Sequence, residues 1–257
     1  MRDNGRVSLY RDDGIVLRTQ KLGEADRIVT VLTRRNGRVR AVGKGVRRTK
    51  SRFGARLEPF THVDLLLYTG RSLDVITQAE TVRAYGEPLA TDYPRYTSGT
   101  AMLETAERFT PMEKEPGIRQ FLLLVGGLRA LGERVHDPRL VLDAYLLRTL
   151  AVAGYAPALD ECAVCGTPDG PGPGDMTGSR SFAVPAGGLT CRSCRPPGAA
   201  SPAVATIALM RSLLRGDWAR ADASQARHQV ECSGLVAAYV QWHLEHSIRS
   251  LRHVEHV

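Results

Sequence analysis

The sequence predicts an α+β multidomain chain: an N-terminal β-barrel followed by a mostly α-helical domain with an inserted four-cysteine module. Short runs of alternating polarity, rich in β-branched residues, occupy residues 14–80, whereas apolar residues recur at helical spacing after residue 85. Two Cys-x-x-Cys pairs then interrupt the helical part. We expect a barrel domain and a helical domain whose two parts flank the module, with boundaries at residues 1–82, 83–160, 161–199 and 200–257.

The strand-like runs follow one another closely, which favours a small barrel. They lie at residues 14–19, 27–33, 38–44, 61–68 and 72–80. Asn36-Gly37, between the second and third runs, predicts a hairpin with a type I′ turn, because both central residues of that turn need positive φ. Gly70 marks another turn between the fourth and fifth runs.

Helical periodicity dominates the rest of the chain. Pro138 fits the first turn of a helix, and Gly154 and Gly216 fit the positions where helices end. The expected helices span residues 98–109, 117–131, 137–154, 201–214 and 234–251.

Positive charge is concentrated at the N-terminal end of the chain. The net charge of the 257 residues is +8, and residues 1–80 hold 17 Lys and Arg against 9 Asp and Glu, whereas the remainder holds 18 of each. A localised excess favours a polyanionic partner, with nucleic acid as the leading candidate. The polar N-terminus does not resemble a secretory signal, and no apolar stretch is long enough to span a membrane, so we expect a cytoplasmic protein without a membrane partner.

The cysteine spacing predicts a zinc site. Cys162, Cys165, Cys191 and Cys194 form two Cys-x-x-Cys pairs separated by 25 residues, and four thiolates complete the tetrahedral set that Zn²⁺ prefers. The Gly/Pro-rich segment between the pairs can absorb the extra length. A redox pair is the competing interpretation, but the βαβ context is missing. A closed four-cysteine site has a structural role, and the remaining Cys232 fits as a small apolar residue of the last helix.

The run between residues 34 and 57 contains ten basic residues and no acidic one. A five-stranded barrel with such a connection before its fourth strand is typical of an OB-fold that binds nucleic acid. Phe53 either stacks on a base or tucks into the end of the barrel, and the alternative for the whole run is a solvated basic loop. The candidate nucleic-acid-binding residues are Arg34, Arg35, Arg38, Arg40, Lys44, Arg47, Arg48, Lys50, Arg52, Phe53 and Arg56.

No catalytic motif accompanies these residues. Lys44 is followed by Gly45, which does not fit the Lys-Ser/Thr of a P-loop, and the histidines of residues 243–246 lack the spacing of zinc proteases. We therefore expect a protein that is not an enzyme.

Residues 13–60, with a "GKG-x-R-x-x-KS" loop and "LEPF", resemble the RecO family of bacterial recombination mediators, as does the following helical region with its four cysteines. The resemblance implies binding of single- and double-stranded DNA without sequence preference, annealing of complementary strands, and no consumed cofactor. It further implies work with RecR and single-stranded DNA-binding protein, an indirect role in RecA filament assembly, and a place in the nucleoid. It assigns no residues to these protein partners.

Two alternatives remain open at this stage. An RNA-binding or ribosome-associated OB/zinc protein would have the same charge and fold, and a preference for RNA over DNA would distinguish it. A metal-dependent nuclease would instead need a carboxylate cluster and would degrade DNA with a divalent cation.

Overall fold

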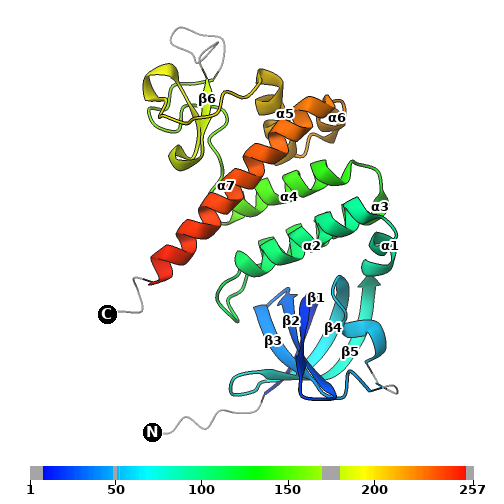
Figure 1. Ribbon diagram of the computed structural model, residues 1–257. Helices are drawn as coiled ribbons and strands as arrows, with labels where there is room; N and C mark the ends of the chain where they lie inside the picture. The colour runs from blue at the N-terminus through cyan, green and yellow to red at the C-terminus, as the bar shows by residue number, and fades with distance from the viewer. Residues whose placement is uncertain (1–7, 49–50, 52, 170–179, 253–257) are drawn as a thin grey trace. The chain divides into compact units, whose positions relative to one another are not determined.

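The computed structural model describes residues 8–48, 51, 53–169 and 180–252. The chain divides into two compact units, Met1–Pro138 and Arg139–Val257. The first unit contains the strands β1–β5 and the helices α1–α3, and the second contains the four-cysteine module and most of the helices α4–α7 (Figure 1). Two predicted site residues, Lys50 and Arg52, lie outside the described residues, as does most of the expected Gly/Pro loop.

The first unit begins with a closed barrel in the strand order β1-β2-β3-β5-β4, which confirms the predicted OB-like fold. Neighbouring strands are antiparallel except β3 and β5, which close the barrel in parallel through the pairs Ala41–Asp74 and Val42–Val75. The strands are β1 (Leu9–Leu22), β2 (Asp26–Thr33), β3 (Gly37–Gly43), β4 (Thr61–Tyr68) and β5 (Asp74–Ala84), with a 3-10 helix η1 (Gly54–Leu57) before β4.

Strand alternation separates the barrel core from its outer surface. In β3, Val39 and Ala41 are fully buried in the core, so Arg38 and Arg40 project from the outside. The same alternation in β2 places Val29 and Val31 inside. A one-residue shift would exchange the two faces, so the apolar pattern fixes the register.

The turn between β2 and β3 differs from the expected type I′ turn. Three residues, 34–36, separate the strands, and of Asn36 and Gly37 only Gly37 has a positive φ, of 64°. The buried Asp12 carboxylate supplies the reason, since it accepts hydrogen bonds from the backbone N–H of Arg35 and Asn36 and from the Asn36 amide. The sequence predicted the hairpin correctly but not this distant acceptor.

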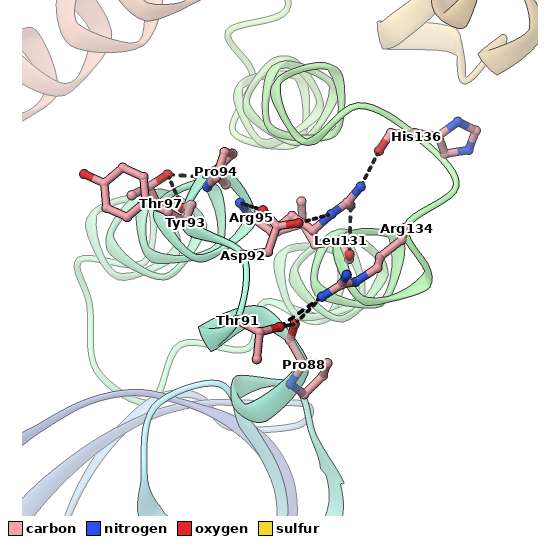
Figure 2. Close-up of polar contacts among 10 residues, drawn as sticks. All are labelled: Pro88, Thr91, Asp92, Tyr93, Pro94, Arg95, Thr97, Leu131, Arg134 and His136. Atoms are coloured by element: carbon pink, nitrogen blue, oxygen red, sulfur yellow. Dashed lines mark hydrogen bonds and ion pairs between the residues drawn. The ribbon is translucent and has the colours of Figure 1, made fainter.

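Three helices follow the barrel in the first unit: α1 (Gly86–Ala90), α2 (Tyr93–Arg108) and α3 (Ile118–Glu133). Phe60, the residue before β4, packs so closely on α2 that a Cβ at Gly99 would lie 2.9 Å from its ring. Arg95 joins the helix ends, because its buried guanidinium bonds Asp92 and the carbonyls of Leu131 and His136 (Figure 2).

Helices of the second unit are α4 (Pro138–Val152), α5 (Val204–Arg215), α6 (Trp218–Asp222) and α7 (Ala226–Arg252). α4 begins at Pro138 and α5 ends at Gly216, whose φ is 83°, as expected from the sequence. Within the unit, Arg148 of α4 donates to the carbonyl of Leu213 in α5, and Ser233 of α7 donates to Asp143. The short helices α1 and α6 were not predicted.

The four-cysteine module lies between α4 and α5 and contains a two-stranded sheet, β6 (Ser181–Ala183) and β7 (Gly188–Thr190). Two 3-10 turns complete it: η2 (Val184–Ala186) and η3 (Arg192–Cys194). Phe182 and Leu189 are buried, and the Phe182 ring meets the Tyr239 ring of α7 with centroids 5.8 Å apart. The module is thus attached to α7 by an aromatic contact, whereas its four thiols face one another.

Candidate nucleic-acid interface and metal centre

The loop after β3 presents cations at one end of the barrel. Lys44, Arg47 and Arg48 are exposed, whereas Val46 between them points into the barrel core. The loop is fixed to the turn between β1 and β2, because the Arg47 N–H donates to the carbonyl of Ala25 at 3.0 Å. The Arg47 side chain also donates to the backbone carbonyl of Glu24 at 2.9 Å. A carbonyl carries no net charge, so this contact does not neutralise the guanidinium.

Phe53 lies inside the barrel. Its side chain is 1% exposed and belongs to the same core as Val46 and Leu57. A ring buried in this way presents no face to a base, so the stacking hypothesis for Phe53 is wrong for this conformation and the alternative, insertion into the barrel end, holds. Burial of Phe53 and Leu57 directs the intervening residues outward, and Arg56 is exposed as a result.

Arg34 and Arg35 are also exposed, but they lie in the turn before β3, at the opposite end of that strand from Lys44. Seven residues of strand separate the two groups, which corresponds to about 23 Å at the usual rise per residue. The predicted basic residues therefore form two separate exposed groups rather than one continuous patch.

Arg38 and Arg40 have acidic partners that the sequence analysis missed. Arg38 Nη1 lies 3.6 Å from Glu107 Oε1, and Arg40 Nη1 lies 3.4 Å from Glu113 Oε1. The run contains no acidic residue, but carboxylates from α2 and the segment after it offset the charge of these two arginines. No local sequence signal indicates such distant pairs.

The outer surface of β2 is covered as well. Thr30 and Leu32, which alternate with the core residues of this strand, are 1% and 0% exposed. OB-folds usually bind nucleic acid on this face, around the second and third strands. In this chain the exposed cations lie at the loops instead.

The four predicted metal ligands converge. The Sγ atoms of Cys162, Cys165, Cys191 and Cys194 all lie within 4.8 Å of one another, and the Cys191 N–H points to Cys162 Sγ at 3.4 Å. This thiol set could hold a metal ion, and four sulfur ligands suit a closed tetrahedral Zn²⁺ site. Cys232 lies apart, fully buried in α7.

Hydrogen bonds in and around the cluster shift the pKa values of these thiols in opposite directions. The side chain and backbone of Thr167 lower the pKa of Cys165 to about 6, because they stabilise its thiolate. Hydrogen bonds with Cys165 and Cys191 raise the pKa of Cys194 to about 12. A divalent cation bound between the four thiols would lower the pKa of each of them, since it favours the thiolate form of every ligand.

Comparison with known proteins agrees with this architecture. A model of the N-terminal part of Recombination protein O matches residues 7–85, and a model of its C-terminal part matches residues 90–252. The chain belongs to the RecO family. RecO from Thermobifida fusca is 69% identical over 249 residues, which cover 97% of this chain and 99% of the relative. RecO from Streptomyces griseus is 60% identical over 255 residues, with 97% and 100% covered.

Both relatives are named DNA repair protein RecO, so family membership supports a role in DNA repair and recombination. The N-terminal RecO match covers the whole barrel, and the C-terminal match includes the four cysteines. None of the helices in the described part of the chain is long and apolar enough to cross a membrane.

Proposed function

We propose that this RecO protein binds single- and double-stranded DNA without sequence preference, anneals complementary strands and, with RecR, helps RecA replace single-stranded DNA-binding protein. The observation that carries the proposal is the exposed group of cations on the loop after β3, namely Lys44, Arg47, Arg48 and Arg56. Such side chains contact phosphates, which are the same in every sequence. Arg34 and Arg35 would extend the contact to the other end of β3.

Annealing follows from charge neutralisation. Two DNA strands repel each other, and a surface that neutralises phosphates of both lowers the free energy needed to bring bases within pairing distance. The annealing rate should therefore fall steeply as salt rises from about 50 to 200 mM. No covalent step is needed, so we propose a mediator rather than an enzyme, acting in the cytoplasm on nucleoid DNA.

The four-cysteine module would hold Zn²⁺ in a structural role. Four protein thiolates fill the tetrahedral coordination shell and leave no position at which water or substrate could be activated. RecR, single-stranded DNA-binding protein and the RecA filament are proposed as partners from the resemblance to the RecO family, without assigned contact residues.

Removing positive charge from the exposed loop should weaken binding to DNA of every sequence by a similar factor. For Arg47→Gln/Arg48→Gln/Arg56→Gln, loss of three phosphate contacts should flatten the slope of log K against log salt by about 2 for a single strand. Fluorescence anisotropy with a labelled oligothymidylate across a salt series measures this slope. The fold is expected to survive, because all three side chains are exposed.

A matched control removes three exposed arginines from helices: Arg108→Gln/Arg119→Gln/Arg227→Gln. The control has the same net charge, so equal slopes for the two variants would exclude the loop as the DNA site. Tighter binding of RNA than of DNA with the same sequence would favour an RNA-binding function instead.

A further inference from the structure

Three arginines on the outer surface of the barrel are held by two glutamates. Arg18 of β1 donates through Nε to both carboxylate oxygens of Glu107, at 2.8 and 2.7 Å, and Arg38 lies against the same carboxylate. Arg40 pairs with Glu113. Strand register places Arg18 and Arg40 opposite the same residue, Thr30, so both lie on one face of the sheet, two strands apart.

Residues 111–115, called the strap below, lie along the edge of β3. The Lys114 N–H donates to the Arg38 carbonyl at 2.9 Å, and the Pro111 carbonyl accepts from the Arg38 guanidinium. Lys114 Nζ also pairs with the buried Asp74 at 2.8 Å. Within the described residues, β5 pairs with β3 only at Ala41 and Val42. The strap pairs with β3 near these residues, at Arg38. Figure 1 shows the α2–α3 connection reaching the barrel beside β3.

The strap is held in a conformation that its own residues do not favour. Lys114 has a φ of 60°, in the left-handed region that a residue with a Cβ seldom adopts. Its ion pair with Asp74 and its hydrogen bond to Arg38 maintain this backbone. The Arg40–Glu113 pair is partly exposed, with 34% and 35% of the two side chains accessible, so a competing anion can reach it.

We propose that Glu107 and Glu113 are autoinhibitory phosphate mimics, which keep Arg18, Arg38 and Arg40 from DNA until DNA phosphates displace the two carboxylates. Carboxylate and phosphate oxygens accept the same charge-assisted hydrogen bonds from a guanidinium, so each excludes the other. Arg18, Arg38 and Arg40 would form a second contact surface, separate from the exposed loop. This inference rests on the proposed DNA binding and adds its regulation.

The test removes the two carboxylate charges without changing side-chain shape. Glu107→Gln/Glu113→Gln should make the three arginines available and add up to three phosphate contacts. The slope of log K against log salt for single-stranded DNA should then steepen by about 2, so affinity should fall roughly 20-fold more between about 50 and 200 mM salt than for the control. Anisotropy with labelled oligothymidylate measures both quantities.

The chain offers a matched control in Glu104→Gln/Glu115→Gln. These two residues lie on the same helix and the same strap, are exposed, and form no ion pair within the described residues. Both double variants gain the same net charge. Should the first fail to fold, Glu113→Gln alone is compared with Glu115→Gln, and one released contact should steepen the slope by about 0.7.

The outcomes separate the two proposals. Measurable binding by the wild type, with equal slopes for the two double variants, would overturn the autoinhibitory role and leave the DNA function in place. Failure of the wild type and of all variants to bind DNA at the lowest salt would overturn the proposed function, and the autoinhibition with it.

Discussion

If the four-cysteine module holds Zn²⁺ as proposed, Cys165→Ser is expected to abolish metal binding and to destabilise the second unit by several kcal/mol. The Cys165 side chain is exposed, and substitutions at exposed positions usually change stability by less than about 0.5 kcal/mol. A larger loss must therefore come from the metal, whose binding contributes about 10–16 kcal/mol in small zinc peptides. Metal content measured by mass spectrometry, together with thermal unfolding with and without a chelator, tests this expectation.

Cys232→Ala provides the control, because it also removes one thiol but lies outside the cluster. This variant should keep its full metal content, and its unfolding should remain sensitive to the chelator. Retention of stoichiometric metal by Cys165→Ser, or a chelator that leaves the wild-type transition unchanged, would contradict the structural role of the site.

The effect should extend beyond the module, because charged contacts join it to α5. Arg211 of α5 pairs with Asp160 at 3.0 Å and with Asp169 at 2.5 Å, and Asp169 is only 1% exposed. If the segment that carries these carboxylates unfolds, the partly buried Arg211 loses its counter-charges. Metal loss is thus expected to lower the stability of the helices together with the module.

Where the determining interactions are local, the sequence predicts the structure well. Alternation in β3 and the apolar residues of β2 were sufficient to place two barrel strands, and the cysteine spacing was sufficient to place four ligands in one cluster. Each of these patterns acts over a few residues. The helix that starts at Pro138 and the one that ends at Gly216 are equally local features.

The errors concern contacts between distant residues. The pairs of Arg38 with Glu107 and of Arg40 with Glu113 join strands to a segment far along the chain, and nothing near either arginine indicates them. The position of Phe53 was left open for a related reason, since a loop aromatic can face either the core or the solvent. Charge counted over a local interval overestimates the free cations, because tertiary structure supplies the counter-charges.

Arg95→Ala is expected to lower the free energy of unfolding of the first unit by about 3 kcal/mol. The guanidinium is buried and joins the start of α2 to the end of α3, where it donates to the carbonyls of Leu131 at 3.0 Å and His136 at 3.3 Å (Figure 2). Alanine would leave these carbonyls without their donor and Asp92 without its cation. Denaturant unfolding followed by circular dichroism measures the loss.

Arg134→Ala is the matched control within the same network. Arg134 also donates to a carbonyl, that of Pro88 at 3.1 Å, but its side chain is exposed, so water can replace it (Figure 2). Arg95→Lys should fall between the two, because an ammonium retains the charge but cannot reproduce the planar fork that bonds three partners. Equal stabilities for Arg95→Ala and Arg134→Ala would show that burial of the guanidinium contributes nothing, and that apolar packing alone holds α2 against α3.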